Sequence, residues 1–360
     1  MPAALCSWCG RRTTHRLVER YVLRRNVHRC AKCGGRTIRC RLCSAMARGR
    51  DGYDEELCFL HDGTLPGRDR LPRRFATLEQ AHPPEIRDGL GFRIAGAALG
   101  AVVSGGSPWG AVAGWSAARA LRTYLAPVSG FGIERVRDGA GPPVLFVDGF
   151  LTQGSALADW AAGLDRVFPR LPWYRVRWES QNLLKLGAAV SEAAGTLRLA
   201  RARPAMLFFE AIRNPWHVAL WKAERTGRLL GFLLARTRLP GGCVLIGHSL
   251  GARVIFEALQ TLGAMGVRRV AAAHLMAAAV DRRGGTPWKL ALRSGARIYN
   301  YHSRHDGVLR WLYVPGSFFL SDPAGLRPVE AAGVRNVDVC RHVRGHAGYA
   351  DALDRIVRAR

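Results

Sequence analysis

Acidic residues are scarce in this sequence of 360 residues, which has 27 Asp and Glu against 54 Lys and Arg. The formal net charge is therefore +27, and arginine supplies nearly all of the positive side. A cationic surface attracts nucleic acid and anionic lipid alike, and an arginine-rich composition also follows from codon bias. Charge alone therefore selects no function. The 48% of hydrophobic residues is typical of a folded globular protein.

Cysteine is nearly absent after residue 58, where only Cys243 and Cys340 remain of the nine in the sequence. Residues 1–12 have no long apolar core and so offer no secretory signal. Clustered cysteine pairs without such a signal indicate metal binding in a reducing compartment and not a disulfide framework. We therefore expect a cytoplasmic protein.

Pairs of metal-ligand residues recur near the N-terminus, each with two residues between its members: Cys6/Cys9, Cys30/Cys33, Cys40/Cys43 and Cys58/His61. Two such knuckles about twenty residues apart complete a tetrahedral zinc site. Sequential pairing gives one site from Cys6, Cys9, Cys30 and Cys33 and another from Cys40, Cys43, Cys58 and His61. A cross-braced pairing uses the same ligands differently, and both pairings remain open. Because four ligands leave no open position, we expect two structural zinc ions, with His15 and His28 as ordinary polar residues.

The partner of this zinc-ribbon-like module is left open between nucleic acid and protein. Residues 1–50 contain thirteen Arg and Lys and a single acid, Glu19, with Trp8 and Tyr21 interleaved. That composition suits contact with a phosphate backbone. Zinc ribbons also bind other proteins, so the composition does not distinguish a nucleic-acid partner from a protein partner.

Residues 94–118 are uncharged throughout, which is long enough to cross a bilayer. The sequence SGGSP at 104–108 divides this run into two short apolar helices that would form a hairpin. Each half carries a G-x-x-x-G pattern, which permits close helix contact in apolar surroundings. Two interpretations remain open: association with an anionic membrane surface, and a helical pair packed on the rest of the protein in water.

The pentapeptide GHSLG at 247–251 contains the predicted nucleophile, Ser249. It follows the short apolar run 243–246 and precedes a helical pattern. A nucleophilic serine needs this strand–turn–helix context, with small neighbours, because its backbone is strained. The helix N-terminus also stabilises negative charge at that point.

The partners of such a serine follow in the order acid, then histidine. Asp306 lies just beyond a predicted strand at 297–302, and His346 follows the next predicted strand at 336–340. Both would lie at carboxyl ends of strands, where such a sheet places its site. Asp281 is the second-choice acid. His305 and His342 are nearby alternatives that we expect to be solvated or structural.

An oxyanion hole requires two backbone N–H groups, of which one comes from the residue after the nucleophile, Leu250. The other is expected from the loop after an early strand. The apolar run 144–147 followed by Gly149 fits that loop, and Phe150 is the predicted donor.

Apolar runs alternate with helical patterns from about residue 127 onward, which predicts a mostly parallel sheet flanked by helices, an α/β-hydrolase fold. The predicted organisation is a zinc-binding module at 1–63, a linker at 64–88, an apolar Gly- and Ala-rich helical segment at 89–126 and a hydrolase domain at 127–360.

Several stretches resemble the family of transmembrane and coiled-coil domain-containing protein 4, which are lipase-like α/β-hydrolases. They are residues 149–152, 214–216, 247–255, 303–306, 325–329, 337–339 and 345–346. The resemblance implies a serine esterase or lipase and carries Ser249, Asp306 and His346 into the catalytic roles. The apolar segment ahead of the hydrolase also resembles the membrane-associated part of that family. Two features depart from the family pattern: the zinc module, and Gly307 where a Trp is expected.

The sequence therefore predicts a serine hydrolase that cleaves an ester, of a lipid or another acyl compound, through an acyl-enzyme. The alternative is a non-catalytic scaffold with a hydrolase fold, whose zinc module binds a protein or a nucleic acid. Loss of function on changing Cys30 but not Ser249 would favour the scaffold.

Overall fold

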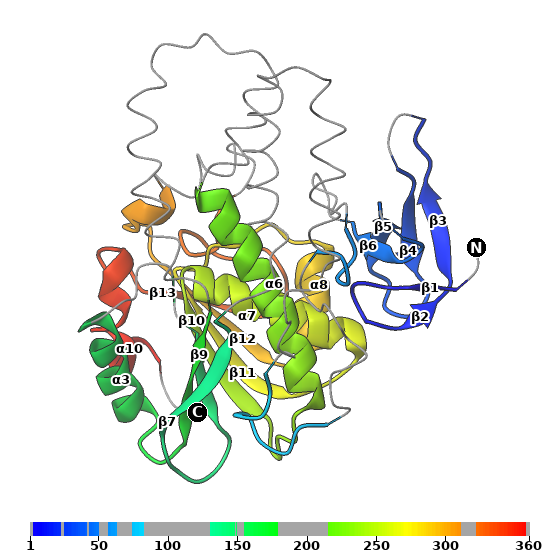
Figure 1. The fold of residues 1–360 in the computed structure, drawn as a ribbon. Helices are drawn as coiled ribbons and strands as arrows, with labels where there is room; N and C mark the ends of the chain where they lie inside the picture. The colour runs from blue at the N-terminus through cyan, green and yellow to red at the C-terminus, as the bar shows by residue number, and fades with distance from the viewer. Residues whose placement is uncertain are drawn as a thin grey trace, which may run out of the picture.

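A computed structural model of the chain describes residues 3–22, 25–41, 43–49, 57–62, 74–82, 130–147, 149, 155–178, 215–310 and 322–357. A mixed α/β body holds the C-terminal part, and a small all-β module lies against one side of it (Figure 1). The uncharged stretch 94–118 and the predicted oxyanion donor Phe150 lie outside the described residues.

The main sheet is parallel for most of its width. Among the described residues it has seven strands, in the order β13-β12-β11-β10-β8-β9-β7. Their bounds are β7 (Gly132–Arg137), β8 (Val144–Val147), β9 (Trp173–Arg177), β10 (Cys243–His248), β11 (Val270–Met276), β12 (Arg297–His302) and β13 (Val334–Asp338). Neighbouring strands are parallel except β7 and β9, which are antiparallel. The mostly parallel sheet predicted from the sequence is confirmed.

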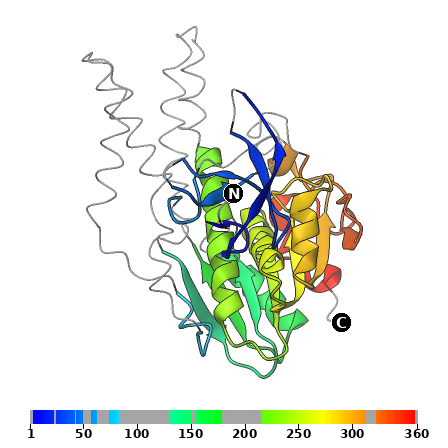
Figure 2. The same cartoon turned by 90° about the vertical axis from the view of Figure 1, so that its right-hand side faces the viewer.

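Helices cover both faces of this sheet, so its central strands are apolar along their length; β8 is buried at every residue. On one face lie α6 (Pro215–Arg236), α7 (Leu250–Met265) and α8 (Thr286–Arg293), and on the other α3 (Ser155–Val167) and α10 (Leu353–Ile356) (Figures 1 and 2). A Cβ added at Gly227 would lie 2.3 Å from the Val254 carbonyl oxygen. Glycine therefore lets α6 lie directly against α7.

The order of the strands reverses beside β8. The chain continues from β8 to β9 on one side, whereas β10 lies on the other side. At such a switch point, the connections from two adjacent strands go to opposite faces of the sheet. Open α/β sheets bind their ligands there, just outside the carboxyl ends of the strands. Ser249 directly follows β10, and Gly149 follows β8 after one intervening residue.

A second sheet forms the cysteine-rich module, by which we mean residues 3–62. In its described part, four antiparallel strands lie in the order β3 (His15–Glu19), β4 (Val27–Cys30), β5 (Arg36–Arg39) and β6 (Met46–Arg48). The short strands β1 (Ala4–Leu5) and β2 (Arg12–Thr13) pair beside them. The module therefore has its own backbone hydrogen bonding, separate from the main sheet.

The cysteine-rich module packs on the helices α6, α7 and α8 (Figure 2). The ring of Phe59 lies 5.5 Å from that of Phe232 on α6, measured between centroids, and joins the main hydrophobic core. The Arg48 guanidinium donates hydrogen bonds to Glu257 at 3.0 Å and to Thr261 at 2.9 Å, both on α7. These helices are thus enclosed between the main sheet and the module.

Residues 74–82, which the sequence analysis assigns to a linker, also contribute to the main core. Phe75, Leu78 and Ala81 are buried there. The backbone N–H of Phe75 donates to the carbonyl of Arg236 at 2.9 Å, and its carbonyl accepts from Arg238 at 3.1 Å. This segment therefore extends the body at the end of α6.

Candidate active site and metal centres

Ser249 occupies a sharp turn between β10 and α7. Its φ of 56° makes it one of two non-glycine residues with positive φ in the described part of the chain. Such a conformation costs about 1–3 kcal/mol and is characteristic of functional sites. A Cβ at Gly247 would lie 2.7 Å from the carbonyl group of Gly251, so glycine at position 247 is a steric requirement of the turn.

Asp306 and His346 are joined by a short hydrogen bond. The Nδ1 atom of His346 lies 2.7 Å from Oδ2 of Asp306, and both side chains are buried. Because a carboxylate only accepts hydrogen bonds, Nδ1 carries the proton, and Nε2 is left with a lone pair that can accept one. The backbone N–H of Leu309 donates to the other Asp306 oxygen at 3.0 Å and holds the carboxylate in place.

His248, the residue before Ser249, links the turn to the loop that carries His346. Its Nε2 lies 2.8 Å from the carbonyl oxygen of His346, and the two imidazole rings are 4.6 Å apart between centroids. Complete burial lowers the pKa of His248 well below its ordinary value, so the ring is neutral and donates from Nε2. This role of His248 is not predicted from the sequence, because its only signal there is its position inside the pentapeptide.

The loop after β8 lies directly against the nucleophile turn. A Cβ at Gly149 would lie 3.3 Å from the Cβ of Ser249 and 2.8 Å from the carbonyl oxygen of His248. Leu250 is the first residue of α7, so its N–H is at a helix N-terminus. Gly149 thus allows the loop after β8 to lie close to the nucleophile turn. An oxyanion hole formed by Leu250 and this loop requires that closeness.

The alternative residues lie in other surroundings. The Asp281 carboxylate is partly exposed and accepts hydrogen bonds from the Arg283 guanidinium at 3.0 Å. His305 and His342 are exposed to solvent. The structure therefore pairs His346 with Asp306 and gives Asp281 a different partner.

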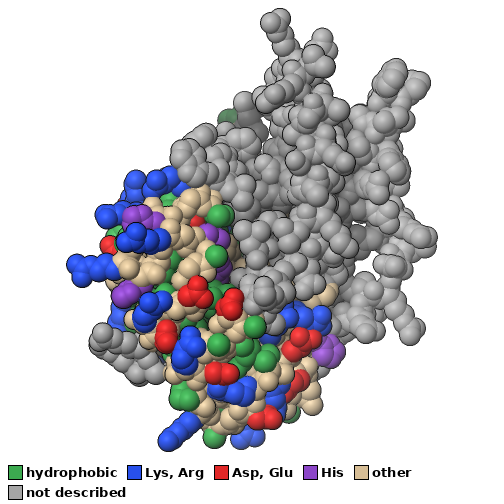
Figure 3. Space-filling view, turned by 90° about the vertical axis from the view of Figure 1, so that its left-hand side faces the viewer, with side chains coloured by type: hydrophobic (Ala, Val, Ile, Leu, Met, Phe, Trp, Pro, Cys, Tyr) green, Lys and Arg blue, Asp and Glu red, His purple; other side chains and the backbone are tan. Residues whose placement is uncertain are grey.

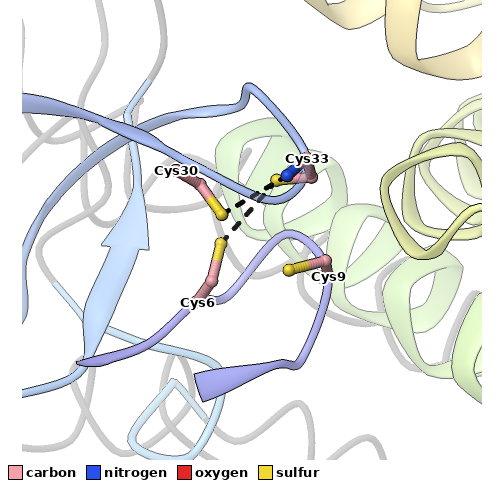
Figure 4. A group of neighbouring side chains, drawn as sticks. All are labelled: Cys6, Cys9, Cys30 and Cys33. Carbon is pink, nitrogen blue, oxygen red and sulfur yellow. Dashed lines mark hydrogen bonds between the residues drawn. The ribbon is translucent and has the colours of Figure 1, made fainter. Parts of the chain in front are cut away.

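The first cysteine cluster brings four sulfur atoms together. Cys6 and Cys9 come from the turn between β1 and β2, and Cys30 and Cys33 from the turn after β4 (Figure 4). The ligand atoms all lie within 4.8 Å of one another, with Cys6 Sγ and Cys33 Sγ 3.9 Å apart. All four residues are buried.

The second cluster joins Cys40, Cys43, Cys58 and His61 with the same compactness. Cys43 Sγ lies 3.7 Å from Cys58 Sγ, and His61 Nδ1 lies 3.7 Å from Cys40 Sγ and 3.3 Å from Cys58 Sγ. Of the two pairings that the sequence leaves open, the structure thus forms the sequential one. His15 and His28 are buried in the module but belong to neither cluster.

These distances fit a tetrahedral metal ion in each cluster. Zn–S bonds of about 2.3 Å and Zn–N bonds of about 2.0 Å place neighbouring sulfurs about 3.8 Å apart and sulfur and nitrogen about 3.5 Å apart. Backbone N–H groups also point at the sulfurs, as from Gly35 to Cys33 Sγ at 3.4 Å and from Ala45 to Cys43 Sγ at 3.3 Å. Such donors stabilise thiolates, which are the metal-binding form of cysteine. Both clusters can therefore hold a metal ion.

A chain of buried charges connects the module with the helix that begins after Ser249. Asp62, the neighbour of His61, accepts a hydrogen bond from Arg228 on α6 at 2.7 Å. Arg228 also lies 3.5 Å from Glu224, which pairs with Arg253 on the first turn of α7. The second metal cluster and the nucleophile turn are therefore joined through side chains of three elements.

Comparisons with known proteins agree with the C-terminal part of this picture. Residues 202–359, less than half of the chain, match the family model described as "Protein of unknown function (DUF726)". The rice "Transmembrane and coiled-coil domain-containing protein STS1" is 30% identical over 226 residues, covering 55% of this chain and 32% of that protein. "Probable lipase MIL1" of Saccharomyces cerevisiae is 29% identical over 151 residues, covering 40% of this chain and 14% of that protein. The chain is thus similar to the rice protein over just over half of its own length and to the yeast protein over two fifths.

The chain spans only about a third or less of the length of these relatives. Among solved structures, an esterase from Rhizomucor miehei aligns over 78% of this chain and 90% of its own, with a TM-score of 0.30 and 11% identity. No described helix of this chain is both long enough and apolar enough to span a membrane.

Proposed function

We propose that this chain is a serine hydrolase of the α/β-hydrolase type that cleaves an ester of a lipid or another acyl compound. The observation that carries the proposal is the buried hydrogen bond of 2.7 Å between His346 and Asp306. It lies on loops that follow β12 and β13, at the same edge of the sheet as the strained turn of Ser249. The name of the yeast relative, "Probable lipase", agrees with an ester substrate.

In the proposed reaction, the Ser249 hydroxyl oxygen attacks the ester carbonyl while Nε2 of His346 takes its proton. Asp306 holds the imidazole in the required tautomer and stabilises its charged form. The N–H groups of Leu250 and Phe150 stabilise the oxyanion. His346 then returns the proton to the leaving alcohol, and an acyl-enzyme remains on Ser249. Water, deprotonated by His346, releases the acid and restores the serine.

Labelling with a fluorophosphonate probe tests this proposal. The wild-type chain is expected to react covalently, whereas Ser249→Ala is expected to remain unlabelled because the attacking oxygen is gone. Ser294→Ala is the matched control, since Ser294 is also a buried serine but lies after α8. Equal labelling of wild type and Ser249→Ala would contradict the proposal, and loss of labelling in Ser294→Ala instead would make Ser294 the reacting serine.

We also propose that the two cysteine clusters hold zinc and that the role of the metal is structural. When bound, zinc supplies a closed tetrahedral link between two turns of the module, with no open position for substrate. Cys6, Cys9, Cys30 and Cys33 would hold one ion, and Cys40, Cys43, Cys58 and His61 the other. The close packing of the module on α6–α8 makes it a structural part of the hydrolase.

Replacing Cys30 by Ala is expected to lower the bound zinc from about two ions per chain to about one, because three remaining ligands do not close a structural site. The same change should make the module sensitive to protease, since metal binding and folding are coupled. Cys243→Ala is the control: Cys243 is equally buried, but it lies on β10 outside both clusters. Elemental analysis that finds the same zinc content in both variants would refute the assignment.

Membrane association belongs to the same proposal, with the bulk of the protein on the cytoplasmic side. Its support is the word "transmembrane" in the name of the rice relative and the uncharged stretch 94–118. Cell fractionation of the full chain and of a chain without residues 89–126 tests this part. Recovery of both in the same fraction would argue against a role for the stretch.

A further inference from the structure

Exposed hydrophobic side chains gather at one place on the described surface, the β3–β4 hairpin, by which we mean residues 15–22 and 25–30. Of five large exposed hydrophobic residues in the described part of the chain, four lie on this hairpin: Leu17, Val18, Tyr21 and Val22. Val22 is 100% exposed and Val18 is 48% exposed. Single exposed apolar residues are ordinary on protein surfaces, but a group of them marks an interaction site.

Arginines lie beside these apolar side chains in cross-strand register. Arg16 on β3 is opposite Arg29 on β4, and Arg29 is opposite Arg36 on β5. Like charges directly opposite each other destabilise a sheet. Glu19, the only acid in residues 1–50, accepts hydrogen bonds from Tyr21 and Arg36. Glu19 thus pairs with the Arg36 end of this row of three guanidinium groups, and Arg29 donates to the Gly34 carbonyl at 3.2 Å. An external anion would relieve the repulsion that remains between the arginines.

The hairpin extends away from the body of the protein. The module contacts α6–α8 through Arg48 and Asp62, whereas β3 and β4 run out on the far side of the module (Figure 1). On the opposite side of the molecule, acidic and basic side chains alternate over α3 and α10 (Figure 3), as in the pair of Arg166 and Asp354. The hairpin, with its row of arginines, thus differs in charge pattern from the surface over α3 and α10.

We propose that the β3–β4 hairpin binds the surface of an anionic phospholipid bilayer. Its arginines would contact lipid phosphates and carboxylates, and Val18, Tyr21 and Val22 would enter the region between headgroups and acyl chains. Exposed aliphatic side chains gain free energy only in an apolar phase, which a bilayer provides and a nucleic acid backbone does not. Proteins that bind single strands stack bases on aromatic rings, and Tyr21 is the one aromatic residue on the hairpin.

This inference does not rest on the proposed catalysis, nor on residues 94–118. The proposed lipid contact is made by the β3–β4 hairpin of the cysteine-rich module, so the experiment must detect contact at that hairpin specifically. Hydroxyl-radical footprinting does so, because the oxidation of Tyr21 is measured directly by mass spectrometry. The experiment uses the full, metal-loaded chain, with both the wild-type serine and Ser249→Ala, so that lipid hydrolysis cannot alter the vesicles unnoticed.

Vesicles of phosphatidylcholine with phosphatidylserine are expected to protect Tyr21 from oxidation, and vesicles of phosphatidylcholine alone are not. The protection should weaken between about 0.05 and 0.5 M NaCl, since salt screens surface attraction. Wild type and Ser249→Ala should behave alike. Short duplex and single-stranded DNA are added in parallel samples.

Matched substitutions separate the contribution of the hairpin to vesicle binding from the contribution of the protein's overall positive charge. Arg16→Ser/Arg29→Ser is expected to weaken partitioning onto anionic vesicles about 25-fold, at about fivefold for each arginine lost. Arg170→Ser/Arg268→Ser removes the same charge from exposed positions elsewhere and should change partitioning by less than about twofold. Val18→Ser should weaken partitioning several-fold, whereas Val136→Ser, at a residue 47% exposed on β7, should leave it unchanged.

Three results would overturn the inference. The first is an unchanged oxidation of Tyr21 on anionic vesicles that do bind the chain, because another surface would then make the contact. The second is equal weakening by the two arginine pairs, which would indicate charge without a site. The third is protection of Tyr21 by DNA and not by vesicles, which would assign the hairpin to nucleic acid.

Discussion

Replacing Asp306 by Asn is expected to lower kcat for an activated ester by about 10⁴-fold. The amide can donate a hydrogen bond to Nδ1 of His346, which then favours the tautomer that carries its proton on Nε2. In that tautomer Nε2 cannot accept the serine proton, although the shape of the site is preserved. The measurement is the hydrolysis of a series of p-nitrophenyl esters at saturating substrate.

Asp281→Asn is the matched control, because Asp281 is the second-choice acid from the sequence and also lies between Ser249 and His346 in the chain. Its carboxylate binds Arg283 at the surface, so kcat should change by less than about twofold. The reverse outcome, a large loss with Asp281→Asn and a small one with Asp306→Asn, would transfer the orienting role to Asp281. Unfolding curves of both variants show whether a loss of activity comes from a loss of folded protein.

Replacing Arg48 by Met is expected to destabilise the metal-loaded chain by about 3–5 kcal/mol, as for other broken buried ion pairs. The side chains of Arg48 and Glu257 are 0% and 1% exposed, and their nitrogen and oxygen lie 3.0 Å apart. Methionine keeps much of the volume over the Trp8 ring, which the guanidinium carbon approaches to 4.3 Å, but leaves Glu257 without its charged partner. Urea unfolding of the full chain measures the change.

Two comparisons test whether the loss comes from an uncompensated charge. Arg48→Met/Glu257→Met should recover most of the stability, because replacing both partners by apolar residues removes the buried charge. Arg166→Met breaks the exposed pair with Asp354, at 52% and 37% exposure, and should cost about 1 kcal/mol or less. Equal costs for Arg48→Met and Arg166→Met would show that the module is not docked through this pair.

Local patterns predict the elements that carry the site. The apolar run, the pentapeptide and the helical pattern around Ser249 predict β10, the strained turn and α7, because each depends on neighbours within a few residues. The spacing of the cysteine pairs likewise predicts the ligands of the two clusters, and the structure settles which pairs come together. The domain boundaries and the catalytic roles remain predictions.

Contacts between distant segments could not be predicted in the same way. Glu257 and Gln260 on α7 resemble the solvent-facing side of an amphipathic helix, yet both are 1% exposed because the module or α6 covers them. Phe75 stands in a polar stretch rich in Gly and Pro and nevertheless lies in the main core. The burial of these residues depends on which distant segment packs against them. The spacing of apolar residues along the sequence contains no information about that segment.

The position of the module in the chain sets an order of events during synthesis. Arg48 and Glu257 are separated by 209 residues, which a ribosome adds in roughly 10–40 s at about 5–20 residues per second. All strands and both cysteine clusters of the cysteine-rich module are therefore synthesised long before α7 exists. The nascent chain therefore presents a module in which Arg48 contacts Ser7 and Trp8 but not yet Glu257, and the α/β body folds onto that surface rather than acquiring it at the end.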